Sequence, residues 1–176
     1  MGDELILVDI HDHNVGHLSK EIVHRNGRLH RAFSIFLIHD GKILLQRREE
    51  KKYHSGGLWT NACCSHPRYG ENLKDAVYRR LREELNVKCN LIEIFSFVYY
   101  TKFPNGLTEY EYDHVFLGEY DGTIIPNPTE ISSIKWVPIS DLCNMVLTKP
   151  EMFTSWFLIS FPKVLQHIER GWFTND

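Results

Sequence analysis

The sequence predicts one layered α+β domain. Its 176 residues suffice for a single hydrophobic core that buries roughly 70% of the unfolded surface. Two long apolar hairpins indicate antiparallel strands, and a segment with apolar residues at helical spacing indicates an amphipathic helix. Because such strands and helices alternate without a repeat or a linker, we expect one domain over residues 1–176 with helices packed on a sheet.

The first half of the chain contains one isolated strand, one hairpin and one helix. Glu4–Ile10 is apolar enough for a strand. His30–Asp40 and Lys42–Arg48 are apolar runs joined at Asp40–Gly41, and Asp-Gly between such runs is a strong signal of a tight hairpin. Asn72–Asn86 places leucine, alanine and valine on one helical face and charged residues on the others, which predicts an amphipathic helix.

The second half begins with another long hairpin. Leu91–Phe103 and Leu107–Tyr120 are rich in aromatic and β-branched residues, and Pro104–Gly106 between them has turn composition. We expect these further elements: a short strand at Ile131–Val137, a helix at Ser140–Leu147, and a helix at Glu151–Arg170 with an interruption at Pro162 and an end at Gly171.

Composition predicts a reducing compartment and gives no sign of a nucleic-acid partner. The net charge of −3 gives no electrostatic reason for a nucleic-acid partner. The four cysteines have no framework spacing, so we expect free thiols and a cytoplasmic protein. The N-terminus lacks the basic region of a signal peptide, and no run reaches the ~20 apolar residues of a membrane span.

Histidine and glutamate suggest a metal site. Glu109 and Glu111 lie two apart on a predicted strand, so both side chains project from one face. Two adjacent carboxylates repel unless a cation or a proton lies between them, although a solvated hairpin face explains the pair equally well. Imidazole with carboxylate suits a divalent metal, but no compact ligand signature occurs. Four histidines stand out by context, each of which could instead be an ordinary surface or core histidine: His24, His30, His66 and His114.

A thiol and a basic cluster are the other candidates. Cys64 lies two residues before His66, and a nearby cation would lower its pKa and suit it to proton transfer, whereas the alternative is an inert buried thiol. On the predicted helix, Arg80 and Glu84 are spaced for an i,i+4 ion pair. A basic cluster follows the first hairpin and is either a solvated end or a diphosphate clamp: Arg47, Arg48, Lys51 and Lys52.

Four motifs, in order, resemble those of the type I isopentenyl-diphosphate isomerases, metal-dependent enzymes of the Nudix fold. Gly57–Pro67 (GLWTNACCSHP) is similar to their signature loop and is the most specific of the four. The others are His24–His30 (HRNGRLH), Glu109–Glu111 (EYE) and Phe153–Phe157 (FTSWF). The resemblance covers nearly the whole chain and implies an α/β/α sandwich with a mixed sheet, its core at about residues 30–165.

The resemblance also implies a role for each matched residue. One divalent metal, Mn²⁺, Zn²⁺ or Mg²⁺, would be bound by His24, His30, His66, Glu109 and Glu111. The catalytic residues would be Cys64, Glu111, Tyr99 and Trp156. The substrate diphosphate would be bound by Lys20, Arg48, Lys52 and Arg80. A Mg²⁺ that arrives with the diphosphate would be held by Glu84 and the backbone carbonyl of Cys64.

The implied reaction interconverts isopentenyl and dimethylallyl diphosphate in isoprenoid biosynthesis. One group protonates the alkene and another removes a proton, which shifts the double bond. We expect Glu111 with Tyr99 to deliver the proton and a Cys64 thiolate to accept the other, with the roles reversed in the back reaction. Adjacent Cys63 leaves the choice of cysteine open by one residue. The chain would act on this small molecule as a monomer or a homodimer.

Two alternatives use the same fold. A Nudix hydrolase would cleave a diphosphate, but Arg80 stands where the resemblance places a metal-binding glutamate of the hydrolases, and like charge opposes a metal there. A binding or sensing module would hold metal and diphosphate without turnover. The joint presence of Cys64, Tyr99 and Trp156 favours an enzyme over such a module.

Overall fold

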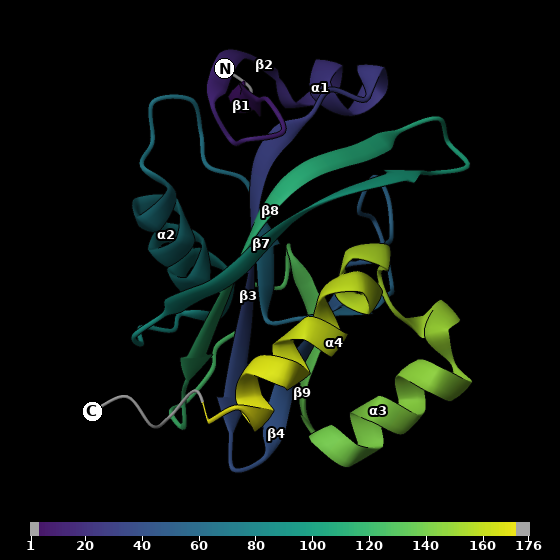
Figure 1. Cartoon of the computed structure of the whole chain (residues 1–176). Coiled ribbons are helices and arrows are strands. Elements are labelled where there is room, and N and C mark those ends of the chain that lie inside the picture. The colour runs from purple at the N-terminus through teal and green to yellow at the C-terminus, as the bar shows by residue number, and fades with distance from the viewer. Residues whose placement is uncertain (1–3, 172–176) are drawn as a thin grey trace.

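Helices cover both faces of a mixed β-sheet in the computed structural model of the chain, which describes residues 4–171 (Figure 1). The strands are β1 (Glu4–Val8), β2 (Asn14–Ser19), β3 (His30–His39), β4 (Lys42–Arg48), β5 (Trp59–Thr60), β6 (Cys63–Ser65), β7 (Ile92–Lys102), β8 (Thr108–Glu119) and β9 (Ile131–Pro138). The helices are α1 (Lys20–Asn26), α2 (Leu73–Leu85), α3 (Ile139–Thr148), the 3-10 turn η1 (Pro150–Met152) and α4 (Ser155–Glu169). This arrangement confirms the predicted α+β class.

Strand β3 is the centre of the sheet because both of its edges are used. One edge pairs in parallel with β8, from His30 opposite Glu111 to Ile38 opposite Glu119. The other edge meets β1, β6 and β4 in succession, always antiparallel. The sheet continues from β8 to β7 and from β4 to β9 and β5. The chain therefore gathers several of its segments around one strand.

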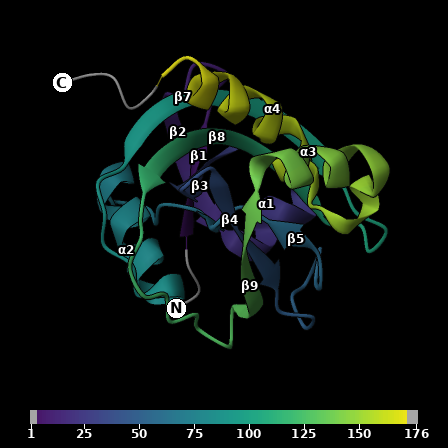
Figure 2. The same cartoon turned by 90° about the horizontal axis from the view of Figure 1, so that it is seen from below.

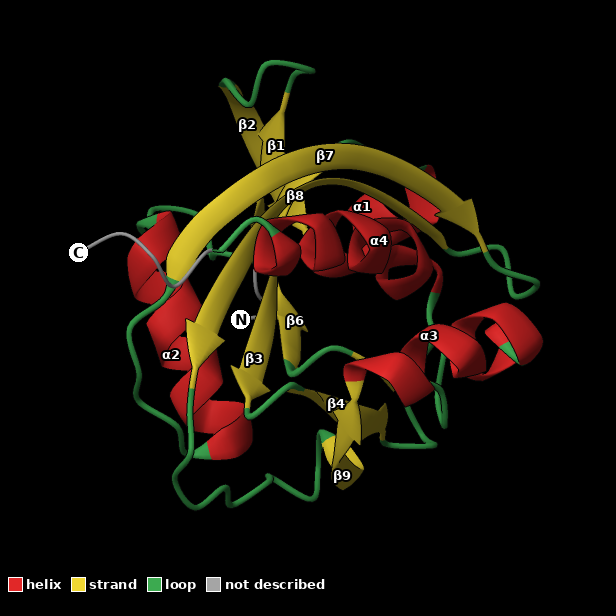
Figure 3. Cartoon of the chain, turned by 60° about the horizontal axis from the view of Figure 1, so that its bottom comes forward, coloured by secondary structure: helices red, strands yellow, loops and turns green. Residues whose placement is uncertain are grey.

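Alternation along β3 creates two cores. Phe33, Ile35 and Leu37 pack in the cluster that contains the apolar face of α2. Phe36 and Ile38 point the other way, into the cluster that contains the apolar faces of α3 and α4. Helix α2 thus lies on one face of the sheet and α3 with α4 on the other (Figures 2 and 3), which is the predicted α/β/α layering.

Most predicted elements form where the sequence places them. Asp40 and Gly41 both have positive φ, 47° and 67°, as the tight turn between β3 and β4 requires. Helix α2 begins after Asn72, whose side chain accepts a hydrogen bond from the Lys74 amide, and ends at left-handed Asn86. The second hairpin is β7–β8, which curves over α4 (Figure 3).

Three predictions need correction. The first strand ends at Val8 rather than Ile10, because the Asp9 carboxylate accepts hydrogen bonds from two following amides and turns the chain. The last helix begins at Ser155, because Thr154 instead donates to the carbonyl of Trp59 and leaves the preceding residue extended. Pro162 lies inside α4 without interrupting it.

Four short elements escaped sequence analysis: β2, α1, β5 and β6. Helix α1 has only seven residues, and β5 and β6 have two and three, too few for a periodic pattern. They matter because α1 carries Lys20 and His24, while β6 carries Cys64. No helix within residues 4–171 is long and apolar enough to cross a bilayer.

Candidate active site

The five predicted metal ligands converge. Each offers one nitrogen or oxygen, and these five atoms lie within 4.8 Å of one another. They come from separate parts of the chain: helix α1, strand β3, the residue after β6, and strand β8. The parallel register sets His30 opposite Glu111 and so joins two of the sources directly. The group consists of His24, His30, His66, Glu109 and Glu111.

Backbone carbonyls orient two of the imidazoles. His24 Nδ1 donates to the Lys20 carbonyl at 2.6 Å, and His30 Nδ1 donates to the Arg28 carbonyl at 2.8 Å. Their Nε2 atoms therefore face the centre of the group, where these atoms and Glu109 Oε2 are buried without a hydrogen-bond partner. Histidines that bind metals are oriented in this way by an outer partner on the second ring nitrogen.

An outer residue binds one oxygen of each of the two carboxylates, Glu109 and Glu111. His54 Nε2 lies 2.6 Å from Glu109 Oε1, while Glu109 Oε2 faces His24 Nε2 at 3.2 Å. The Tyr99 hydroxyl donates to Glu111 Oε2 at 2.6 Å, while Glu111 Oε1 faces His66 Nε2 at 2.8 Å. Each glutamate thus turns one oxygen towards the histidines and has the other oxygen bound by an outer donor.

This donor set fits a divalent metal. Burial, together with neighbouring Glu111, raises the pKa of Glu109 to about 7. A cation between the two carboxylates removes that repulsion, and three imidazole nitrogens with two carboxylate oxygens suit a divalent metal. The buried atoms without partners are the ones that such an ion would engage.

Period-two alternation along β6 separates the adjacent cysteines. Cys63 is fully buried in the core beside α2, whereas Cys64 packs on the α4 side and lines the cavity. The Cys64 thiol donates to Asn61 Oδ1 at 3.0 Å, and Trp156 Nε1 donates to Cys64 Sγ at 3.1 Å. Only Cys64 of the two therefore has its sulfur on the side of the cavity.

The expectation of a lowered pKa for Cys64 is wrong. Burial, with the nearby Asp113 carboxylate, raises the pKa of the thiol to about 12. Cys64 is on strand β6 rather than in a loop, and its shortest hydrogen bonds are to Asn61 and Trp156, with a longer one from Ser34. In the ligand-free chain the sulfur therefore keeps its proton at neutral pH.

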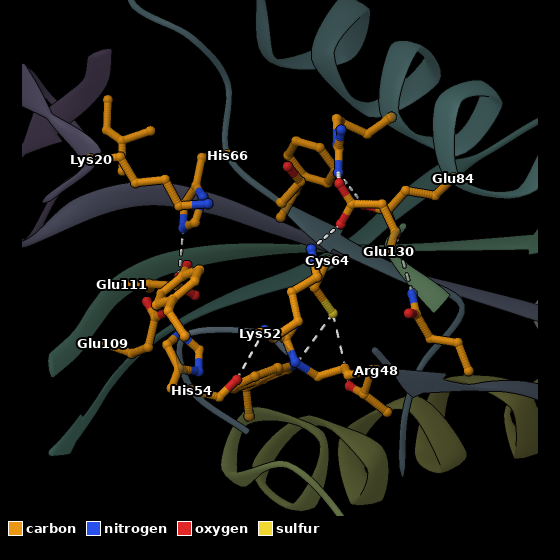
Figure 4. Close-up of a pocket in the computed structure, with 18 of the residues that line it drawn as sticks. Lys20, Arg48, Lys52, His54, Cys64, His66, Glu84, Glu109, Glu111 and Glu130 are labelled. Carbon is orange, nitrogen blue, oxygen red and sulfur yellow. Dashed lines mark hydrogen bonds and ion pairs between the residues drawn. The ribbon is translucent and has the colours of Figure 1, made fainter. Parts of the chain in front are cut away.

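The four predicted diphosphate ligands line one cavity, of about 150 Å³, together with His66, Glu109, Glu111 and Cys64: they are Lys20, Arg48, Lys52 and Arg80. His24 and His30 are not among its lining residues. Figure 4 shows Cys64 between the side that carries His66 and Glu111 and the side that carries Glu84 and Glu130. Glu84 is 4% exposed, and its oxygens accept from Arg80 at 2.5 Å and from Gln46 at 3.2 Å. One side of the cavity thus carries the histidine and glutamate residues with Lys20, and the other, called here the cationic side, carries Lys52 and Arg80 beside Glu84 and Glu130.

Three residues outside the predicted site are placed by the structure. His114 is no part of the metal group, because it lies three positions after Glu111 on β8 and so projects from the opposite face; it lies between Glu93 and Asp12 instead, at 2.5 and 2.9 Å. His54 and Glu130 line the cavity although the sequence analysis did not single them out. The only available signal for His54 was its place two residues after Lys52 in the basic cluster.

Known proteins share this fold and sequence. Residues 28–157 match the NUDIX domain family. A crystal structure of a Deinococcus radiodurans protein has a TM-score of 0.69 and 25% identity, covering 84% of this chain and 90% of that one. The MutT protein from Methanosarcina mazei has a TM-score of 0.65 and 18% identity, covering 80% of this chain and 95% of that one. The fold is therefore that of a Nudix domain, and the chain belongs to this domain family.

Sequence relatives identify the family to which the chain belongs among the Nudix domains. A protein of Aromatoleum aromaticum named isopentenyl-diphosphate Delta-isomerase 2 is 49% identical over 166 residues, 94% of this chain and 88% of the relative. A protein of the same name from Photorhabdus laumondii is 49% identical over 158 residues, 89% of each chain. The chain belongs to the isopentenyl-diphosphate Delta-isomerase family.

Proposed function

We propose that the chain interconverts isopentenyl diphosphate and dimethylallyl diphosphate by moving one proton onto, and another off, the five-carbon unit. The proposal rests on one observation: two groups that could transfer protons line the same cavity. Glu111 with its Tyr99 partner lies at one place in the cavity, and Cys64 lies at another. An allylic shift needs such a pair, because the proton gained and the proton lost are on different carbons.

The cavity suits a cationic intermediate. Protonation of the terminal carbon of an unactivated alkene leaves a tertiary carbocation that water would trap. Trp156 is 3% exposed and Tyr99 is 5% exposed, so their rings form a dry wall beside Cys64. The indole face of Trp156 would stabilise the positive charge by about 2 kcal/mol when desolvated.

We propose the order expected from the sequence, in which Glu111 with Tyr99 delivers the proton and Cys64 accepts the other. A raised pKa makes the Cys64 thiol a weaker acid and its thiolate a stronger base, which suits this residue to accept a proton. Each forward turnover leaves Glu111 without the proton that it gave and Cys64 with the proton that it took, and proton exchange with solvent restores both groups. In the back reaction the two groups exchange roles.

Four cations that line the cavity would anchor the diphosphate: Lys20, Arg48, Lys52 and Arg80. We assign the Mg²⁺ that accompanies the substrate to Glu84 and the Cys64 carbonyl. The metal of the five-residue site would be held by His24, His30, His66, Glu109 and Glu111, and when bound it would order Glu111 and tune its acidity. Binding energy from the diphosphate would thus hold the alkene between Glu111 and Cys64. All four cysteines are free thiols, which supports a cytoplasmic enzyme.

The test is incubation with isopentenyl diphosphate in D₂O, followed by NMR. We expect dimethylallyl diphosphate that carries deuterium, and Cys64→Ala should abolish its formation while diphosphate binding persists. Cys143→Ala is the matched control, because that cysteine is not among the cavity-lining residues. Turnover by Cys64→Ala would refute the assignment, and binding without deuterium exchange in the unaltered chain would indicate a sensing module.

Hydrolysis is the competing activity. Arg80 donates to Glu83 and Glu84 at 2.8 and 2.5 Å. Its guanidinium therefore occupies the part of α2 where a metal ion for hydrolysis would have to bind. Release of phosphate or pyrophosphate during incubation with Mg²⁺ would favour a Nudix hydrolase instead.

A further inference from the structure

Glu130 enters the cationic side of the cavity. It precedes β9 and is fixed by its backbone, since its amide donates to Asn127 and its carbonyl accepts from Glu49, both at 3.0 Å. Its side chain is 25% exposed and lines the cavity. No motif of the sequence analysis includes this residue, so its position is a finding of the structure alone.

The Glu130 carboxylate bridges two cations from distant elements. Its Oε2 contacts Lys52 Nζ in the loop after β4, and its Oε1 lies 3.4 Å from an Arg80 guanidinium nitrogen on α2. Both cations belong to the set proposed to bind diphosphate. A carboxylate between a lysine and an arginine makes the contacts that a phosphate oxygen would make there. In the ligand-free chain Glu130 therefore occupies donors that the substrate needs.

Arg80 also connects Glu130 with Glu84. The same terminal nitrogen of Arg80 lies 2.5 Å from Glu84 Oε1 and 3.4 Å from Glu130 Oε1. The two carboxylates consequently flank one guanidinium. If a diphosphate entered alone, two glutamates and a multiply charged anion would compete for these cations, and like-charge repulsion would weaken binding. A divalent cation shared by the anions removes that conflict.

We propose that Glu130 holds the diphosphate position in the ligand-free chain and, with Glu84, takes the Mg²⁺ that arrives with the substrate, which releases Lys52 and Arg80 for the diphosphate. This inference rests on the proposed diphosphate site and adds a residue to it. Mg²⁺ and diphosphate then favour each other's binding by the same factor, because coupling between two ligands is reciprocal. Free diphosphate without a divalent cation would be selected against.

The test is calorimetric titration with inorganic pyrophosphate, with Mg²⁺ and with EDTA. The unaltered chain should bind pyrophosphate far more tightly with Mg²⁺. Glu130→Gln removes the competing charge, so it should bind pyrophosphate about tenfold more tightly than the unaltered chain in EDTA. Its gain from Mg²⁺ should be correspondingly smaller. Glu130→Ala should behave alike and serves as a second variant if either folds poorly.

Glu50→Gln is the matched control. Glu50 pairs with Arg47 outside the cavity, so its loss breaks one ion pair but should leave pyrophosphate binding unchanged in both buffers. Equal or weaker binding by both Glu130 variants in EDTA would overturn the inference while leaving the proposed function intact. Failure of the unaltered chain to bind pyrophosphate under either condition would instead contradict the proposed function itself.

Discussion

Tyr99→Phe is the sharpest perturbation of the proposed proton-transfer group. The substitution removes one oxygen, which donates to Glu111 Oε2 at 2.6 Å. The ring would keep its contacts with Phe97 and Trp156, whose centroids lie at 5.6 and 6.5 Å. The variant should therefore fold normally and change only the carboxylate that we assign to proton transfer.

The size of the effect follows from that one hydrogen bond. A hydrogen bond to a charged group contributes about 1.5–3 kcal/mol, and each 1.36 kcal/mol changes a rate tenfold. If the transition state gains this full contribution relative to the ground state, Tyr99→Phe should slow isomerisation by about 10- to 150-fold. The loss should fall mainly on kcat, because other residues make the proposed diphosphate contacts.

The assay is the initial rate of dimethylallyl diphosphate formation, followed by NMR, together with the thermal unfolding midpoint and the bound metal content. Tyr100→Phe is the matched control, since Tyr100 is 60% exposed on the opposite face of β7. A Tyr99→Phe rate within twofold of the unaltered chain, with metal content unchanged, would refute the role of this hydrogen bond.

Three further predictions concern metal, stability and pH. His30→Gln should weaken divalent-metal binding by about tenfold or more, measured by chelator competition, whereas His114→Gln should retain it; equal losses would contradict the site. Glu71→Gln removes the carboxylate that accepts two hydrogen bonds from one arginine, at 2.6 and 2.8 Å, and should cost about 1 kcal/mol in urea unfolding at pH 7. Because the hydrogen bonds from that arginine lower the pKa of Glu71, this difference should disappear as pH falls through that pKa, and a difference that persists in acid would be inconsistent with the ion pair. With the other cysteines replaced by serine, alkylation of Cys64 in the metal-free chain should still be rising at pH 10, because burial raises its pKa to about 12; a plateau near pH 9 would disagree.

Local signals made much of the fold predictable. The turn at Asp40–Gly41, the capped helix α2 and the β7–β8 hairpin depend on neighbours in sequence, and all three form as expected. The start of α4 could not be found this way, because a backbone bond from Thr154 to Trp59, far away in sequence, ends the preceding helical segment. At this position a tertiary hydrogen bond, and not local helix propensity, sets where the helix begins.

The candidate site was likewise only partly predictable from the sequence. The five metal-group residues could be named only because their motifs resemble a family, since spacing alone left His24, His66 and even His114 equivalent. His54 and Glu130 touch the site through the fold alone, from a loop and from the residue before β9. The protonation of Cys64 was also beyond the sequence, because it depends on burial beneath α4.

The parallel alignment of β3 with β8 ties assembly of the protein to its chemistry. His30 faces Glu111 only in this register, and a slip by one position would turn the carboxylates of β8 to the far face of the sheet. The two strands are joined by a long stretch of chain, so a folding intermediate that lacks this pairing has separated ligands. Metal would then bind only the chain with the completed sheet and would stabilise it relative to such an intermediate.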